Sequence, residues 1–188
     1  MKRHLIGIIT LVTPLSTAFA ADHYTLDPGH TFPRWAVSHF GFSTHHGQFN
    51  KTSGKLVLDA KAGSGSVEVT VDTASIATGD PALEKHLRSA DFFSVEKFPT
   101  LTFKSKSMKF EGGKPVATSG DFTLLGVTKP MTFRITQVKC AMHPIAKKEA
   151  CGAEVSGTIK RSAFGMKYGA PALGDDITLT VQVEAIKD

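Results

Sequence analysis

Four histidines lie close together near the start of the chain, and imidazole is a common protein ligand for zinc and copper. They are His30, His39, His45 and His46, within the segment HTFPRWAVSHFGFSTHH. A zinc site needs three or four ligands that converge on one ion. His45 and His46 are neighbours, and neighbouring side chains of an extended strand point to opposite faces. We therefore expect these histidines to form a polar rim or strand-end hydrogen bonds, and we expect no metal site.

Nucleophilic catalysis needs a nucleophile and a base within hydrogen-bonding reach of each other. The chain has no G-x-S-x-G motif, in which a strained turn exposes a catalytic serine. Ser38 and His39 are adjacent, but on a strand they would face opposite sides. The run GSGS at 63–66 is typical of a hairpin turn and not of a phosphate-binding loop. We predict a protein that is not an enzyme, with no catalytic residues and no cofactor apart from a bound lipid.

The first twenty residues are typical of a cleavable signal peptide. Residues 2–4 are basic, residues 5–15 are mostly apolar, and residues 18–20 have the small-x-small pattern of a cleavage site. The alternative is an N-terminal membrane anchor, but spanning a bilayer takes about 20 apolar residues. We expect an exported, periplasmic protein with a signal peptide at 1–20 and one domain at 21–188.

The two cysteines of the chain flank a segment that resembles a hairpin loop. Cys140 and Cys151 lie on either side of AMHPIAKKEA. An exported protein can form a disulfide, whereas a metal-binding pair lacks support because there is no C-x-x-C spacing. We expect a disulfide between them.

The charge of the chain is mildly basic. It has 22 Lys and Arg residues against 17 Asp and Glu, a formal net charge of +5. The lysines are scattered singly, as on a solvated strand face, and no basic run is interleaved with aromatic residues. Nucleic-acid binding, which depends on such a basic surface, is therefore not expected.

The elements that must position these residues are mostly strands. Apolar and polar residues alternate, which predicts strands with one buried and one solvated face. The alternating segments are 55–60, 66–76, 100–110, 113–126, 129–140, 151–161 and 176–186. Segment 80–93 differs, because Asp80 suits a helix N-cap, Pro81 suits the first turn, and Leu83 and Leu87 share a face. We expect about eight antiparallel strands and one short helix, closed as a barrel or packed as a two-sheet sandwich.

The aromatic content is skewed toward phenylalanine. The chain has thirteen Phe residues, one Trp and two Tyr, so aromatic residues with a polar tip are scarce. Met108, Met131 and Met166 add side chains that adapt to irregular apolar shapes. These residues suit either an ordinary core or the wall of a cavity for an extended hydrocarbon, and composition alone leaves both open.

Four segments together resemble the YceI-like family of exported bacterial polyisoprenoid-binding proteins. They are YTLDPGHTFPRWAVSHFGFSTHHGQF, HLRSADFFSVEKFPTLTFKS, GDFTLLGVTKPMTF and CGAEVSGTIKRSAFGM, and the resemblance runs over roughly 24–185. It implies an all-β, lipocalin-like antiparallel barrel with a long apolar interior. It also implies a non-enzymatic carrier of a polyprenyl chain, an isoprenoid quinone or another long-chain lipid. Some members are implied to be homodimers or to have cytochrome b-type membrane partners.

On this interpretation the aromatic residues and their apolar neighbours form much of the cavity wall. The predicted wall residues are Phe32, Trp35, Phe40, Phe42, Phe49, Phe92, Phe93, Phe103, Phe122, Leu124, Met131, Phe133, Phe164 and Met166. Strand register decides which of them face inward. Arg34, His39 and Arg88 are candidates for contact with a head group, since a polyprenyl phosphate would favour a guanidinium near the opening. For each arginine the alternative is a solvated position on an outer face.

Two other functions remain open from the sequence. One is a metal-binding or redox-associated periplasmic protein that uses the histidine cluster. The other is a stress-related barrel without cargo, whose interior is filled by its own side chains. The presence or absence of a continuous interior cavity distinguishes the lipid carrier from the filled barrel.

Overall fold

The computed structural model describes residues 21–188, and the expected signal peptide lies outside these residues. The strands are β1 Asp22–Leu26, β2 Phe32–His39, β3 Ser43–Phe49, β4 Thr52–Asp59, β5 Ser64–Asp72, β6 Ile76–Ala77, β7 Thr100–Glu111, β8 Lys114–Leu124, β9 Val127–Met142, β10 Glu149–Lys160 and β11 Asp176–Lys187. The helix α1 spans Pro81–Arg88, and short 3-10 helices span Thr73–Ser75 and Arg161–Phe164. No helix within 21–188 is long and apolar enough to cross a bilayer.

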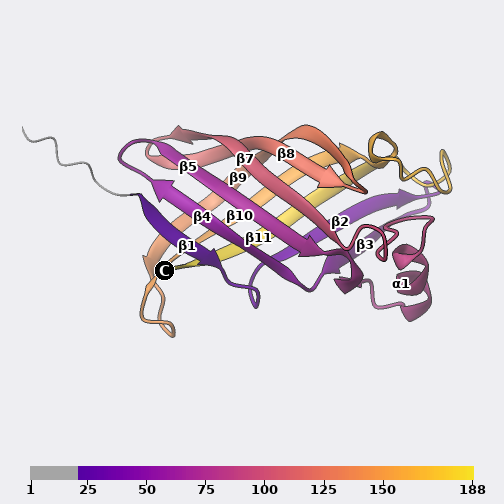
Figure 1. Cartoon of the computed structure of the whole chain (residues 1–188), viewed down its shortest axis with the longest axis horizontal. Coiled ribbons are helices and arrows are strands. Elements are labelled where there is room, and N and C mark those ends of the chain that lie inside the picture. The colour runs from indigo at the N-terminus through magenta and orange to yellow at the C-terminus, as the bar shows by residue number, and fades with distance from the viewer. Residues whose placement is uncertain (1–20) are drawn as a thin grey trace, which may run out of the picture.

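Eight strands form a closed antiparallel barrel, as the sequence predicts. Their order around the ring is β1, β4, β5, β7, β8, β9, β10 and β11, and β11 pairs with β1 to close it. The remaining strands β2, β3 and β6 extend from β11 at one end of the barrel, beside α1 (Figure 1). The barrel therefore has one end that is enlarged by additional elements.

Strand β11 has two different partners on the same side. Its residues Thr178–Gln182 pair with β2, and Ala185–Lys187 pair with β1. Between these two pairings, the fully buried side chain of Thr31 bonds to the backbone of β11 in place of a partner strand. Its Oγ1 donates to the carbonyl of Glu184 at 3.1 Å and lies 3.2 Å from the Glu184 N–H, which donates to it. One threonine hydroxyl thus hydrogen-bonds the carbonyl and N–H of Glu184 at the point where β11 changes from β2 to β1 as its partner.

Alternation along the long strands directs phenylalanine side chains into the barrel. Phe103, Phe122 and Phe133 come from the neighbouring strands β7, β8 and β9 and are all buried. The rings of Phe103 and Phe133 meet edge to face at 5.0 Å, and those of Phe122 and Phe164 at 5.6 Å. These pairs form the middle of the core and a large part of the inner wall.

The single α-helix begins where the sequence predicts. The side chain of Asp80 accepts hydrogen bonds from the N–H groups of Ala82 and Leu83, at 2.9 and 3.3 Å, and Pro81 occupies the first turn. The helix ends at Arg88, and the chain turns back through a hydrogen bond from the Phe93 N–H to the Leu87 carbonyl. The amphipathic helix buries Leu87 against the barrel end.

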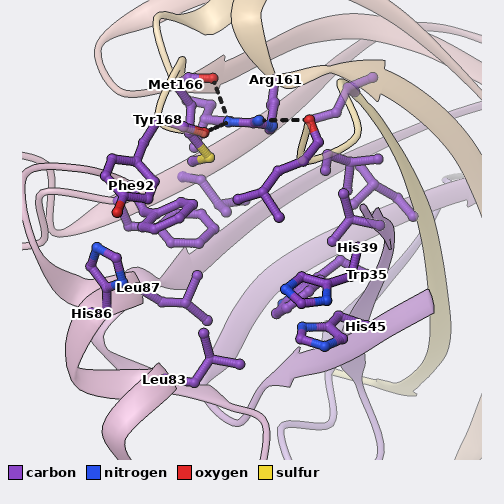
Figure 2. Close-up of a pocket in the computed structure, with 18 of the residues that line it drawn as sticks. Trp35, His39, His45, Leu83, His86, Leu87, Phe92, Arg161, Met166 and Tyr168 are labelled. Carbon is purple, nitrogen blue, oxygen red and sulfur yellow. Dashed lines mark hydrogen bonds between the residues drawn. The ribbon is translucent and has the colours of Figure 1, made fainter. Parts of the chain in front are cut away.

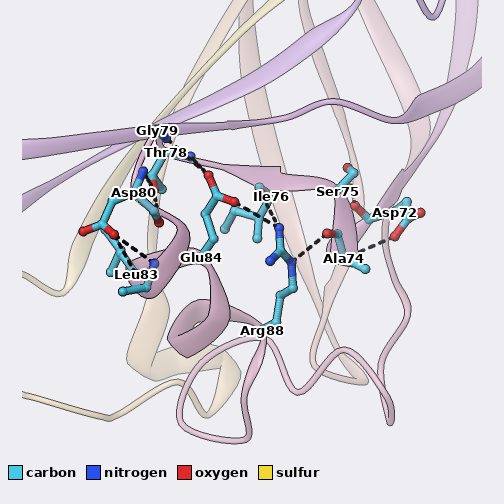
Figure 3. A network of polar contacts seen from close by, with 11 residues as sticks. Asp72, Ala74, Ser75, Ile76, Thr78, Gly79, Asp80, Leu83, Glu84 and Arg88 are labelled. Atoms are coloured by element: carbon cyan, nitrogen blue, oxygen red, sulfur yellow. Dashed lines mark hydrogen bonds and ion pairs between the residues drawn. The ribbon is translucent and has the colours of Figure 1, made fainter.

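Arg88 connects α1 to the segment that contains β6 (Figure 3). Its guanidinium donates to the carbonyls of Ala74 and Ile76 at 2.9 and 2.8 Å and to the carboxylate of Glu84 at 3.3 Å. Glu84 in turn accepts from the Thr78 N–H at 2.8 Å, which lowers the pKa of this carboxyl. The Nε and Nη2 groups of Arg88 thus contact two carbonyls and Glu84, and Arg88 lines neither of the two chambers described below, which differs from the contact with a head group expected from the sequence.

The predicted disulfide between Cys140 and Cys151 is present, with an S–S distance of 2.03 Å. The two residues are paired across β9 and β10. The bridge therefore fixes the base of the hairpin that extends past the barrel at the end away from α1 (Figure 1). A disulfide is typical of exported proteins.

Replacing Thr31 with valine tests whether its hydroxyl stabilises the point where β11 changes partner strand. Thr31→Val keeps the shape of the side chain but leaves the buried Glu184 N–H without its acceptor, which costs about 1–3 kcal/mol of unfolding free energy. Urea denaturation followed by circular dichroism measures the loss. Thr180→Val on the exposed face of the same strand is the control, with an expected change of about 0.5 kcal/mol or less. Equal effects of the two substitutions would contradict this role of Thr31.

Candidate binding cavity

The barrel interior contains two chambers that lie end to end. The mouth chamber, at the end that carries α1, has a volume of about 290 Å³. The inner chamber has a volume of about 160 Å³. Both are lined by Phe49, Leu101, Phe122 and Leu179. These four side chains form the junction at which the chambers meet, so the interior is a divided bore.

The inner chamber is almost entirely apolar. Its wall includes Leu26, Leu56, Leu58, Val67, Val69, Val71, Phe103, Met108, Phe133, Ile135, Val155, Val181 and Val183. Thr31 and Thr118 are also in the wall, but each hydroxyl donates to a backbone carbonyl. A surface of this kind favours a hydrocarbon, because each methylene removed from water contributes about 0.8 kcal/mol.

The mouth chamber is enclosed from three sides (Figure 2). Its wall includes Trp35, Val37, His39 and His45 from β2 and β3, Leu83, His86 and Leu87 from α1, and Met166, Tyr168 and Leu173 from the segment before β11. Phe40 and Tyr168 also line the chamber and are 51% and 47% exposed. The chamber therefore reaches the protein surface beside these two rings.

Three histidines gather at the mouth chamber. The rings of His39 and His45 stack at 4.0 Å, nearly parallel. His86 lies edge-on to Phe92 and Tyr168, both at 5.0 Å, and its Nε2 lies 2.8 Å from the carboxylate of Asp91. These rings add a few polar groups to a chamber wall that is otherwise mostly apolar, and the inner chamber has fewer such groups.

Trp35 lies over Gly47, its partner on β3. A Cβ atom at position 47 would be 2.3 Å from Cζ2 of the indole, so only glycine leaves room for the ring there. The buried Nε1 of Trp35 has no hydrogen-bond partner within the described residues. Sequence analysis identified Trp35 as a wall residue but gave no signal for the contribution of Gly47.

Arg161 organises the segment that closes one side of the mouth chamber. It is 2% exposed. Its guanidinium donates to four backbone carbonyls between residues 166 and 174, at 2.8–3.0 Å. Figure 2 shows the bonds to the carbonyls of Met166 and Tyr168. Beside it, the N–H and hydroxyl of Ser162 donate to Asp175 and lower the pKa of that carboxyl. Sequence analysis missed Arg161, because a lone arginine after a strand is indistinguishable from a surface residue.

Ten of the predicted wall residues line one of the chambers. They are Trp35, Phe40, Phe49, Phe92, Phe93, Phe103, Phe122, Leu124, Phe133 and Met166. Sequence analysis did not place Leu83, His86, Tyr168 or Leu173 in this wall, because they come from the helix and a loop where strand alternation gives no information.

The other four predicted wall residues lie outside the chambers. Phe164 is buried in the core against Phe122, and Met131 packs on the core without reaching a chamber. Phe32 lies three residues before Trp35 and so points to the opposite face of β2. Phe42 is 93% exposed in the turn between β2 and β3. These placements differ from the prediction. The physical reason is strand parity for Phe32 and a position in a turn for Phe42, whereas Phe164 packs within the core and Met131 against it.

Arg34 has a different position from the one expected for a head-group contact. It contributes to the wall of the inner chamber, but its Nε donates to Gln48 at 3.5 Å on the exposed outer face. His46 and Arg34 both line a groove on the outer surface of the protein, whereas His45 faces the mouth chamber. The opposite orientation of the two neighbouring histidines agrees with the alternation expected from the sequence.

The histidines near the N-terminus do not converge on one point. Within residues 21–188, one group of three possible metal ligands has its ligand atoms within 4.8 Å of one another, namely Asp27, His30 and Glu184. The Nδ1 of His30 lies 2.8 Å from Asp27, and this hydrogen bond lowers the pKa of Asp27 and raises that of His30. None of the three lines a chamber. The geometry is that of a surface pair of Asp27 and His30 next to a second carboxylate, that of Glu184.

Comparison with known proteins agrees with this architecture. The family model described as YceI-like domain matches residues 24–185. The chain is 34% identical over 191 residues to Protein YceI of Escherichia coli O157:H7. The alignment covers 100% of this chain and 99% of that protein. The crystal structure of the Campylobacter jejuni YCEI protein has a TM-score of 0.71 at 28% identity, covering 81% of this chain and 90% of that one.

More distant structures share the fold. A polyisoprenoid binding domain from Saccharophagus degradans, implicated in plant cell wall breakdown, has a TM-score of 0.64 at 13% identity and covers 88% of this chain and 98% of that one. Burkholderia cenocepacia BcnA has a TM-score of 0.72 at 22% identity, covering 85% and 98%. At these identities the likeness concerns the fold alone.

Replacing Arg161 tests its organising role. In Arg161→Lys the ammonium keeps the charge but cannot reach all four carbonyls, so we expect a loss of about 3 kcal/mol of unfolding free energy. Faster amide hydrogen exchange over residues 166–174 should accompany it. Arg134→Lys, at an exposed position on β9, is the matched control. Unchanged exchange in Arg161→Lys would show that the segment is held by other contacts.

Proposed function

The chain belongs to the YceI-like domain family, and from this we propose that it binds a long isoprenoid chain without chemical conversion. The observation that carries the proposal is the bore, in which an apolar inner chamber continues from a mostly apolar mouth chamber that has three histidines and a tyrosine in its wall. Cavities that hold small ligands have volumes of about 300–1,000 Å³. The mouth chamber alone is at the lower limit, and the two chambers together fall within this range.

The two chambers suggest how such a ligand is oriented. The hydrocarbon tail occupies the inner chamber, where burial of each methylene contributes about 0.8 kcal/mol before the cost of ordering the chain is subtracted. The head group lies in the mouth chamber near His39, His45, His86 and Tyr168. A head group placed among the apolar side chains of the inner chamber would lose most of its hydration, which is unfavourable.

The mouth chamber favours a neutral head group. Arg161 is the one arginine or lysine among the residues that line it, and its guanidinium is occupied by four carbonyls. A phosphate would therefore find no free cation there, whereas imidazole and phenol groups can donate to a carbonyl or hydroxyl oxygen. An isoprenoid quinone or a polyprenol fits this lining better than a polyprenyl phosphate.

We further propose that the protein is a periplasmic carrier or store of this lipid and not an enzyme. The disulfide supports an exported location. The solved polyisoprenoid binding domain of Saccharophagus degradans shares the fold, and the two chambers disfavour a barrel filled by its own side chains. A homodimer and a cytochrome b-type membrane partner stay predictions from the family resemblance.

The direct test is extraction of the protein with organic solvent after purification from its periplasm. Mass spectrometry should find a neutral isoprenoid in amounts comparable to the protein. Absence of lipid, together with no binding of added quinone or of the polyprenol solanesol, would overturn the proposal. Stoichiometric metal that resists chelation would support the histidine-based alternative instead.

A substitution at the junction tests whether the ligand extends through both chambers. Leu179→Trp places an indole where the chambers meet, and we expect about tenfold or more weaker binding of solanesol, since overpacking of a filled space costs about 1–3 kcal/mol. Farnesol, which is short enough for the mouth chamber, should bind nearly as before. Titration in detergent solution measures both affinities.

The matched control for this experiment is Thr180→Trp, which places the same side chain on the outer face of the same strand. It should bind both prenols normally. If Leu179→Trp also binds solanesol normally, the ligand does not pass the junction.

A further inference from the structure

We propose that the mouth end of the barrel docks onto the surface of an anionic phospholipid bilayer, so that ligand passes between the membrane and the bore. The mouth end consists of the β2–β3 turn at residues 40–42, helix α1 and the segment 165–173. This inference rests on the proposed function, because a lipid that enters from a membrane must reach the opening without crossing water.

Exposed aromatic rings surround the opening. Phe42 is 93% exposed, Phe40 51% and Tyr168 47%, and the last two also line the mouth chamber. The apolar surface of the chamber thus continues onto the outside of the protein. Single exposed apolar residues are ordinary, but a patch that is continuous with a cavity indicates a binding surface.

The backbone of the β2–β3 turn holds Phe42 in its exposed position. Phe40 has a φ of 53° and Gly41 a φ of 75°, and the Phe42 N–H donates to the His39 carbonyl at 3.0 Å. A left-handed conformation is uncommon for a bulky residue such as phenylalanine. The turn therefore directs a large ring into solvent by a tight, hydrogen-bonded geometry, and a bilayer is a partner that can bury it.

The charges at the mouth end favour an anionic surface. Lys85 on α1 and Lys167 beside Tyr168 are exposed and have no ion-pair partner within the described residues. On the same elements, Glu84 is paired with Arg88, the side chain of Asp80 caps α1, and Asp91 lies 2.8 Å from His86. Free lysines next to exposed aromatic rings are the combination by which proteins bind the interface of anionic membranes.

A second exposed apolar tip provides an internal comparison. Ile145 lies in the β9–β10 hairpin loop and is 85% exposed, and Met142 lies at the end of β9 and is 69% exposed. Neither residue lines a chamber. This hairpin lies at the end of the barrel away from α1 (Figure 1). If docking serves ligand entry, removal of the ring at residue 42 should matter and removal of the side chain at residue 145 should not.

The experiment compares Phe42→Ser with Ile145→Ser in sedimentation with phosphatidylcholine vesicles that contain one quarter phosphatidylglycerol. Phe42→Ser should lower the partition coefficient about tenfold, the effect of losing one buried ring. Ile145→Ser should bind like the wild type. Solanesol transfer between donor and acceptor vesicles should slow by a similar factor in Phe42→Ser, while solanesol binding in detergent stays unchanged because Phe42 lies outside the chambers.

The double variant Lys85→Gln, Lys167→Gln tests the electrostatic part. Its vesicle binding should lose most of the dependence on phosphatidylglycerol content that the wild type shows. Three results would overturn docking: wild-type protein that binds solanesol but not vesicles, equal effects of the substitutions at residues 42 and 145, or a Phe42→Ser effect on self-association in sedimentation velocity instead of on vesicle binding. Failure of the wild type to bind solanesol in detergent would overturn the proposed function itself.

Discussion

A barrel that holds a lipid must be closed along its length and open at one end. The strand β11 meets both requirements because it pairs with two different strands along its length. β11 closes the ring through β1 near its C-terminus and pairs with β2 nearer its N-terminus. Where the partners change, a ladder would leave backbone groups without hydrogen bonds, which is costly when they are buried. The hydroxyl of Thr31 satisfies the Glu184 N–H there. The mouth exists because β2, β3 and β6 can leave the ring at this point without an unpaired backbone.

The irregular parts of the mouth are fixed by two arginines with similar chemistry. Arg88 binds the carbonyls of Ala74 and Ile76 and so attaches α1. Arg161 binds the carbonyls of the segment before β11. The planar guanidinium has five donors in a fixed geometry, which suits loops whose carbonyls have no strand partner. Each arginine thus positions part of the wall while its charge stays unavailable to a ligand.

Most of the fold could be predicted from sequence because the signals are local. Period-two alternation indicates strands, Asp80 and Pro81 indicate the start of the helix, and Cys140 and Cys151 flank a hairpin loop. The site was less predictable because it depends on register and turns. Phe40 and Phe42 are alike in sequence, yet the turn directs one toward the chamber and the other into solvent.

The roles of Arg161, which is buried, and of the glycine at position 47 could not have been identified from the sequence, for a related reason. Burial of Arg161 depends on carbonyls that are up to thirteen residues away along the chain, and the need for glycine at 47 depends on an indole from another strand. Residue type alone predicts neither the hydrogen bonds of Arg161 nor the contact between position 47 and the indole. The same dependence on tertiary context explains why His45 and not His46 contributes to the mouth chamber.

The position of the polar groups at the mouth end of a mostly apolar bore has a consequence for release. A ligand that sits with its tail inward must leave head first, so its last methylenes leave the inner chamber only when the head has already moved beyond the mouth. In water each exposed methylene opposes this movement by about 0.8 kcal/mol. Against an apolar acceptor the cost disappears, because the tail is transferred from one hydrocarbon environment to another. A bore of this kind would therefore retain a lipid in solution and release it where an apolar surface meets the opening.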